Sequence, residues 1–377
     1  MDVGYDKDGK RKKKGVGGFR TKKEAEEAAA QLLLELKSGT YTEESDISFC
    51  DFSQTWLDDY KLSGVKKGTV NIRRTEISHL IKYFNKISIK DITRKQYQDA
   101  LYDLLEKGYA EKTIEGIHCV GVMIFDKAME LKAIKENPTQ YARSPRRHLT
   151  LAEADELDRK EEIPKFLEKE ELEQFLKTAK HMGLKDDYTI FLTLAYTGLR
   201  VGELCALRDI NIDIQECTLS VTRTYFNERS NIKKYELTSP KTIASRRKMK
   251  ISKKVVDQLE NLIKIQEMAK EKHKEKWHDK GFIFCAPNFL GYPLDPKLIG
   301  LRMTRLLKLS GLNEKLTPHS LRHTHTSLLA EAGVSLEAIM ERLGHENDKI
   351  TRKIYLHVTK AVKKEAVEKF DQLMDSL

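Results

Sequence analysis

The chain has 377 residues, of which 40% are hydrophobic and 33% are charged. This length predicts two or three domains, and the composition excludes a wholly disordered or collagen-like chain. No run approaches the roughly 18 apolar residues of a membrane-spanning helix, and the five scattered cysteines form no CxxC pair, so we expect neither a disulfide framework nor a zinc knuckle but a reducing cytoplasm.

Positive charge gathers in two segments. Residues 1–23 hold nine Lys or Arg against three Asp, and residues 232–254 hold nine against one Glu. Together with the net charge of +10, these segments favour a polyanionic partner. Residues 151–173 reverse the balance, with ten acidic and four basic side chains, and we interpret 141–163 as a linker.

The first predicted element is a small module over residues 1–42. A turn at Asp8–Gly9 lies between basic flanks, and the first strand of a hairpin would have to lie within or before residues 1–5. Thr21 and Glu24 have capping-box spacing, so a helix should begin there.

A helical unit is predicted over residues 46–140. Phe52, Trp56 and Tyr60 form one apolar stripe at helical spacing. Two further helical segments cover 97–105 and 114–131, which completes a four-helix unit. The second stripe comprises Ile72, Ile77, Leu80, Ile81 and Phe84.

Residues 164–360 are predicted to form a larger mixed domain. Helices are expected near 168–180 and 186–197, and strands near 218–226, 248–252 and 282–285. The tail 361–377 is amphipathic, and it could pack on its own domain or dock on a neighbouring subunit. The fold class is therefore multidomain and mainly α, with a small β component.

Three histidines near residue 320 raise the question of a metal site. His319 and His323 would share a helix face, but a zinc protease motif needs Glu at position 320, where this chain has Ser. Arg322 would also place a permanent positive charge beside the metal. We therefore expect no metal and no cofactor, although ordinary structural histidines leave the segment 318–322 unexplained.

Residues of the C-terminal half form one constellation. It comprises Arg200 in TGLRVGEL, Lys241 in SPKT, His319 and Arg322 in HSLRHTHTSLL, His345 in LGHENDKITRKIYLHV, and Tyr355. These sequence motifs resemble those of the tyrosine recombinases, or phage integrases, in order and spacing. The resemblance covers essentially the whole chain and extends to integrases of Gram-positive prophages and integrative conjugative elements.

The resemblance implies a domain order and a reaction. Residues 1–42 resemble an arm-site DNA-binding module with a shortened first strand, 46–140 a core-binding domain, and 164–360 the catalytic domain. The implied enzyme is a bacterial, cytoplasmic site-specific recombinase that cleaves and rejoins DNA through a covalent 3′-phosphotyrosine, without metal or ATP.

Each residue of the constellation has an expected role. Arg200 and Arg322 suit bidentate binding of phosphate oxygens, and Tyr355 is the nucleophile. Lys241 resembles the general acid toward the 5′ oxygen, His319 is the better candidate for the tyrosine proton, and His345 for phosphate hydrogen bonding. Glu203, one turn after Arg200, would support a catalytic cation or be a plain surface carboxylate.

Tyr355 also has an ordinary alternative as a packing residue. Ile354 and Leu356 could then form the core face of the helix while Tyr355 points away from it.

Further basic side chains are expected to contact the DNA backbone, although some could be plain surface charge. They are Lys12, Lys13, Lys14, Arg20, Arg146, Arg147, Lys233, Lys234, Arg246 and Arg247. The expected partners are double-stranded attachment sites, three further copies of the chain in a tetramer that exchanges C-terminal helices, and a directionality factor; no membrane is expected. A type IB topoisomerase and a catalytically silent DNA-binding regulator remain the alternative functions.

Overall fold

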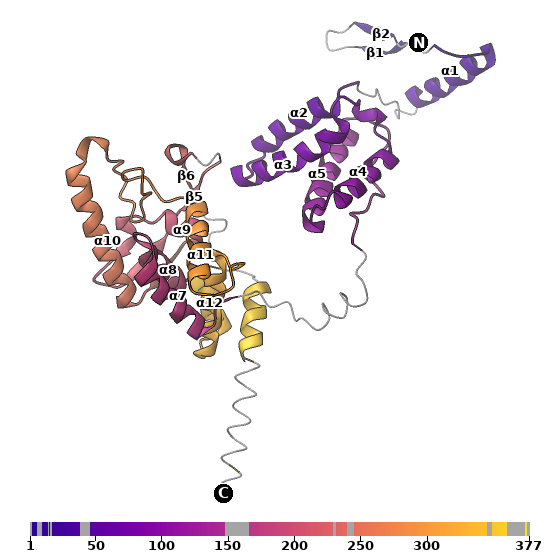
Figure 1. The fold of residues 1–377 in the computed structure, drawn as a ribbon. Helices are drawn as coiled ribbons and strands as arrows, with labels where there is room; N and C mark the ends of the chain where they lie inside the picture. Colours follow the sequence, from indigo (N-terminus) through magenta and orange to yellow (C-terminus); the bar gives the residue numbers. More distant parts are fainter. Residues whose placement is uncertain are drawn as a thin grey trace. The chain divides into compact units, whose positions relative to one another are not determined.

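The computed structural model of the protein divides into two compact units, residues 1–149 and 150–377. Helices dominate both units, and the described strands are short (Figure 1). The architecture is thus multidomain and mainly α with a small β component, as the sequence predicts. The structure describes residues 2–5, 10–13, 15, 17–37, 46–147, 166–228, 231–239, 245–344, 349–359 and 374.

The chain begins with the expected hairpin and helix. Two antiparallel strands precede a helix in which half of the predicted capping box forms, because Thr21 Oγ1 accepts the Glu24 N–H at 3.2 Å. The Glu24 carboxylate accepts the N–H of Arg20 at 2.9 Å. The predicted turn at Asp8–Gly9 lies outside the described residues. The elements are β1 (Asp2–Tyr5), β2 (Arg11–Lys13) and α1 (Lys22–Lys37).

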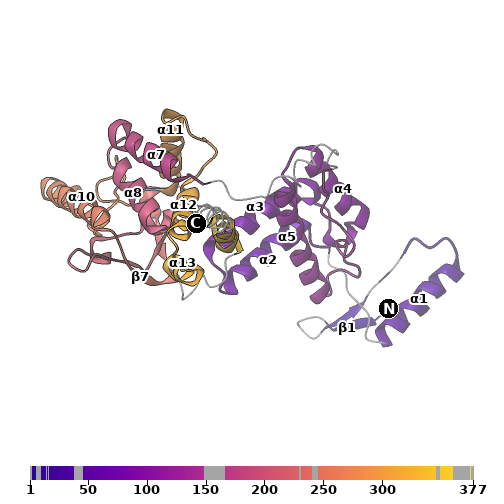
Figure 2. The ribbon, with the colours of Figure 1, turned by 90° about the horizontal axis from the view of Figure 1, so that it is seen from below.

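Four helices enclose one apolar core in the rest of this unit, and α2, α3 and α5 lie side by side (Figure 2). The ring of Phe84 packs edge-on against Phe49 at 5.6 Å and stacks on Tyr97 at 6.1 Å. Ile72 was predicted to belong to the second apolar stripe, but it is 58% exposed. A spacing of five residues places its side chain roughly 140° from that of Ile77 around the helix axis. The elements are α2 (Phe49–Leu62), α3 (Lys67–Phe84), η1 (Ile89–Asp91), α4 (Arg94–Glu106) and α5 (Glu111–Glu130).

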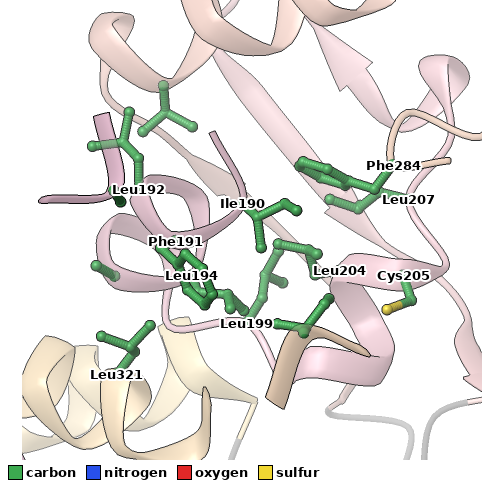
Figure 3. Packing of buried hydrophobic residues seen from close by; sticks show 14 of the residues in the cluster. Ile190, Phe191, Leu192, Leu194, Leu199, Leu204, Cys205, Leu207, Phe284 and Leu321 are labelled. Atoms are coloured by element: carbon green, nitrogen blue, oxygen red, sulfur yellow. The ribbon is translucent and has the colours of Figure 1, made fainter. Parts of the chain in front are cut away.

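The C-terminal unit is built around α8, whose residues are buried on nearly every side. Phe191 of α8 meets Phe175 of α7 edge-on at 5.2 Å, and Leu321 of α12 lies in the same core (Figure 3). No helix in the described ranges is long and apolar enough to cross a membrane. The helices are α7 (Lys169–Met182), α8 (Asp187–Thr197), α9 (Val201–Cys205), η2 (Asp209–Asn211), η3 (Ile232–Lys234), α10 (Lys253–Lys272), η5 (Lys274–Lys276), α11 (Pro296–Leu309), α12 (Pro318–Glu331), α13 (Leu336–Leu343) and a helical segment at 349–359.

The strands of this unit form two small sheets. One sheet has the order β3-β4-β7, with Leu219 paired to Met249, and the other is the hairpin β5-β6. The predicted strand 218–226 is therefore two strands in different sheets. The strands are β3 (Ile212–Asp213), β4 (Thr218–Val221), β5 (Thr224–Phe226), β6 (Glu236–Thr238) and β7 (Arg247–Lys250).

The predicted strand at 282–285 does not form. Phe282 and Cys285 make isolated bridges to two separate segments, at Arg208 and Pro293. Each bridge joins a different stretch of chain, so no continuous ladder develops, although the segment is buried like a core strand.

Candidate active site

The turn between α8 and α9 carries the first arginine of the predicted constellation. Gly198 follows the last residue of α8 and has φ +63°, a conformation that favours glycine. A Cβ at this position would lie 2.7 Å from Cδ2 of His325 and 2.7 Å from Cδ2 of Leu343. The turn therefore requires glycine for both its backbone and its space, and it places Arg200 at the N-cap of α9.

A buried carboxylate joins this turn to strand β7. Glu203 accepts the backbone N–H of Arg200 at 3.0 Å and its Nη1 at 2.9 Å, and Nη2 of Arg247 donates to the same carboxylate at 2.9 Å. The side chain of Glu203 is 1% exposed and that of Arg247 6%, whereas that of Arg200 is 35% exposed. Two guanidinium groups thus flank one carboxylate, and the more accessible of the two belongs to Arg200.

The ionisation of Glu203 follows from these contacts. Burial alone would raise the pKa of the carboxyl. The hydrogen bond and charge of Arg247, together with the charge of Arg200, outweigh burial and hold the pKa of Glu203 below its usual value. Glu203 is therefore charged at neutral pH and orients Arg200, and its burial excludes the alternative of a plain surface carboxylate.

Arg322 lies on α12 and is 1% exposed. Its Nη1 donates to the carbonyl of Gly198 at 2.5 Å, although 124 residues separate the two in sequence, and its Nη2 donates to the carbonyl of Leu343 at 2.7 Å. One side chain therefore fixes both the turn before Arg200 and the end of α13. The structure brings the Arg200 and Arg322 segments together, and it gives Arg322 carbonyl partners inside the protein.

The three histidines of α12 have different surroundings. His319 is exposed in the first turn, and its ring meets that of His323 edge-on with centroids 4.7 Å apart. His325 is buried, with Nδ1 2.8 Å from the carbonyl of Ala195. Across the described ranges, no three His, Cys, Asp or Glu side chains gather as a metal site would require.

His325 is held as a neutral ring. Arg342 donates its Nε–H to Nε2 of His325 at 3.1 Å, so the ring proton lies on Nδ1 and points to Ala195. Burial, then the positive charges of Arg342 and Arg322, lower the pKa of His325 to about 3. We therefore assign His325 to structure rather than to proton transfer.

Arg342 is a connecting residue that the sequence reading did not identify. Its Nη1 and Nη2 donate to the carbonyls of Lys250 and Tyr196 at 2.9 and 3.3 Å, and its own carbonyl accepts Nε of Arg247 at 2.8 Å. The end of α13 is thereby tied to β7 and α8. The one sequence signal is its place immediately before the Leu-Gly-His box.

Tyr355 lies in the helical segment 349–359 and is half-buried. It packs against a small cluster that includes Leu343, whose carbonyl binds Arg322. Ile354 is fully buried as the packing alternative expected, but Leu356 is 50% exposed, and Tyr355 itself borders the cluster. Tyr355 is therefore next to the segment that Arg322 holds.

Two members of the constellation, Lys241 and His345, lie outside the described residues. The structure describes their neighbours: β6 ends at Thr238, shortly before Lys241, and Gly344, which caps the end of α13 with φ +67°, directly precedes His345. Along the chain, the hairpin β5-β6 comes between β4 and β7, which are neighbours in the other sheet. Lys241 thus belongs to the connection between β6 and β7.

The basic side chains expected to contact DNA fall into three groups. Lys12 and Lys13 belong to β2, whose side chains the structure does not describe, and Lys14 lies outside the described residues. Arg247 is buried against Glu203, which removes it from the set of surface contacts. The exposed members are Arg20, Arg146, Arg147, Lys233, Lys234 and Arg246.

The chemistry of the assembled part suits a phosphate diester. An accessible guanidinium, oriented by a buried carboxylate, offers N–H donors and a permanent positive charge to an anionic oxygen. A tyrosine hydroxyl carried by an adjacent helix is a potential oxygen nucleophile. Transfer of a phosphate from one ester bond to another involves no change of oxidation state, so these residues need no redox group.

Three family models match the chain. The phage integrase family matches residues 165–361, the arm DNA-binding domain residues 1–36, and the N-terminal SAM-like domain of phage integrases residues 48–105. These matches follow the order of the segments described above.

Individual relatives and a solved structure agree with these models. The integrase of Staphylococcus phage L54a is 35% identical over 184 residues, which is 48% of this chain and half the length of that relative. The ICEBs1 integrase of Bacillus subtilis strain 168 is 28% identical over 94% of this chain and 91% of its own. The Tn1549 transposon integrase in complex with transposon right end DNA has a similar fold, with a TM-score of 0.65 at 23% identity over 85% of this chain and 99% of that one.

Proposed function

The chain belongs to the phage integrase family, and from this premise we propose that it is a site-specific DNA recombinase that integrates or excises a mobile element. The observation that carries the proposal is the pair of hydrogen bonds from Arg322 to the carbonyls of Gly198 and Leu343. They join the segments that lead to Arg200 and His345, beside the helix that holds Tyr355. A single backbone phosphate could therefore meet residues from all three segments.

The proposed cleavage step conserves the number of phosphate ester bonds. The phenol oxygen of Tyr355 attacks the phosphorus, a 3′-phosphotyrosine bond forms, and the bond to the 5′ oxygen breaks. His319 takes the tyrosine proton, and Lys241 gives a proton to the departing 5′ oxygen. Attack by a 5′ hydroxyl of another strand reverses these steps, so rejoining needs no ATP.

The developing negative charge on the phosphate oxygens needs preorganised donors. Arg200 supplies an oriented guanidinium, which Glu203 holds in place. His345 would complete the proposed set by donating a hydrogen bond to a phosphate oxygen. Arg322 would add its positive charge from within the protein, because its two Nη groups donate to the carbonyls of Gly198 and Leu343.

We assign the remaining segments to binding and assembly. Residues 1–42 would contact arm sites and residues 46–140 the core site, with 141–163 as the linker and 164–360 as the catalytic domain. The exposed Arg20, Arg146, Arg147 and Arg246 would contact phosphates and give a salt-dependent affinity. The reaction would take place on double-stranded attachment sites in the bacterial cytoplasm, with a directionality factor choosing between integration and excision.

Assembly would use the tail 361–377 as a helix exchanged between the subunits of a tetramer. Apart from Met374, the tail lies outside the described residues, and its sequence repeats apolar residues at helical spacing. A cavity of about 1000 Å³ in the C-terminal unit is a candidate acceptor. Leu172, Leu176, Leu328 and Leu329 line it and would receive the apolar face of a helix.

The test uses a nicked DNA substrate taken from the junction sequences that flank the gene. The nick lets the short fragment that carries the new 5′ hydroxyl diffuse away, so the wild-type protein should accumulate a covalent DNA adduct. Tyr355→Phe should bind the same DNA and form none. A wild type that forms no adduct, or an adduct that persists in Tyr355→Phe, contradicts the proposal.

The same assay separates the two alternative functions. Relaxation of supercoiled plasmids that lack the junction would indicate a topoisomerase. Specific binding without any adduct would indicate a silent regulator.

A further inference from the structure

Arg247 makes more buried contacts to the active-site segments than its place in a basic surface run suggests. Its Nη2 donates to the Glu203 carboxylate at 2.9 Å and its Nη1 to the same carboxylate at 3.4 Å. Its Nε donates to the carbonyl of Arg342 at 2.8 Å, and its Nη1 to that of Ser245 at 3.2 Å. With 6% of its side chain exposed, Arg247 is directed into the protein.

The charges around Glu203 explain what such an arginine can do. Glu203 carries one negative charge, and Arg200 and Arg247 carry one positive charge each, so the cluster has a net charge of +1. The excess lies toward Arg200, because its side chain is 35% exposed and the other two are buried. Without Arg247, Glu203 and Arg200 would form a neutral pair, and the attraction of that pair for a phosphate would be much weaker.

We propose that Arg247 is a positioning residue for DNA cleavage, which neutralises Glu203 so that Arg200 keeps an uncompensated positive charge for the scissile phosphate. The inference rests on the proposed recombinase function and extends it to a residue that does not touch the DNA itself.

Nε of Arg247 donates to the segment that precedes His345. The Arg342 carbonyl that it binds is one residue before Leu343, whose own carbonyl binds Arg322. Consecutive carbonyls at the end of α13 are thus held by two arginines from different elements. Arg247 also lies at the start of β7, directly after the β6–β7 connection that carries Lys241. It therefore connects the turn at Arg200, the start of β7 and the end of α13.

The test compares single and double substitutions in the full-length protein. Arg247→Met removes the charge and the hydrogen bonds, and we expect the rate of covalent adduct formation at saturating DNA to fall about 100-fold, the effect of losing one oxyanion donor. Adding Glu203→Gln removes the carboxylate that Arg247 had neutralised and returns the net charge at Arg200 to +1. The double variant should therefore recover about tenfold or more of the lost rate.

Loss of packing alone predicts the opposite result, because two buried substitutions should then be worse than one. Arg246→Met is the matched control, since it removes the same charge from the exposed neighbouring residue, and its defect should not be relieved by Glu203→Gln. Arg247→Lys should retain more rate than Arg247→Met, because it keeps the charge but loses the guanidinium fork.

Each outcome decides the inference separately from the proposed function. An inactive wild type contradicts the recombinase function itself. An active wild type with an equally active Arg247→Met, or with a double variant as slow as Arg247→Met, overturns the role of Arg247. If Arg247→Met fails to fold by circular dichroism, Arg247→Gln replaces it in the same comparison, because an amide can still donate to Glu203.

Discussion

Gly198 offers the sharpest test of how the turn at the end of α8 holds the active site. We expect Gly198→Ala to destabilise the C-terminal unit and to slow DNA cleavage. The new Cβ would lie 2.7 Å from ring carbon Cδ2 of His325 and 2.7 Å from Cδ2 of Leu343. Neither neighbour can easily move, because His325 is hydrogen-bonded at both ring nitrogens and Leu343 is fully buried.

The magnitude has two parts. A left-handed backbone costs a non-glycine residue about 1–2 kcal/mol, and overpacking a buried site costs about 1–3 kcal/mol. The free energy of unfolding should therefore fall by about 2–5 kcal/mol. For a unit of this size, that lowers the transition temperature by roughly 5–15 °C. Displacement of the Gly198 carbonyl would also loosen Arg322, so cleavage should slow even where the protein is folded.

The assay is differential scanning calorimetry of the full-length protein, followed by adduct formation at a temperature where both proteins are folded. Gly300→Ala is the control, because Gly300 lies inside α11 with no heavy atom within 4 Å of the added Cβ. Alanine in a helix interior should stabilise by about 1 kcal/mol. A Gly198→Ala variant as stable and as active as the wild type would refute the close packing that we infer at this turn.

Two further predictions concern pH and salt. The pKa of His325 is about 3 in the folded protein and about 6.5 when unfolded, so the unfolded state binds an extra proton between these values. The contribution of the neutral His325 to the free energy of unfolding is complete above pH 6.5 and falls by about 1.4 kcal/mol per pH unit below it. Thermal unfolding between pH 6.5 and 5 should show this slope, and His325→Gln should flatten it; equal slopes would contradict the assignment. Replacing the exposed Arg146 and Arg147 by Gln should lower the slope of log affinity against log salt by about 2, measured by DNA binding at several salt concentrations, and an unchanged slope would exclude them as phosphate contacts.

The sequence alone predicted the features that depend on local patterns. The helix N-cap at Thr21, the four helices around Phe84 and the start of α8 follow from side-chain spacing along a single segment. The candidate residues around Arg200 and Arg322 could also be grouped from the sequence, because their motifs occur in the order and spacing of a known family. These signals are local in the chain, so they can be read before anything is known of the packing.

Predictions from local patterns were wrong where a neighbouring element decides whether a strand forms or a side chain is buried. The run 282–285 has the composition of a core strand, yet its bridges go to Arg208 and Pro293 in separate segments. Likewise, Arg246 and Arg247 are adjacent basic residues, but Arg246, just before β7, is exposed, whereas the side chain of Arg247, the first residue of β7, is 6% exposed. Sequence cannot distinguish such cases, because the partner across the sheet or the core is absent from the pattern.

The amino-acid order thus determined where many of the helices lie and which residues are candidates for binding a phosphate. Tertiary structure decided that Arg322 binds the backbone beside Arg200, that Arg342 holds His325 neutral, and that Arg247 shares Glu203 with Arg200. The physical reason is that a buried charge must find its partners within a few ångströms. Which groups lie that close depends on how the folded segments pack against one another.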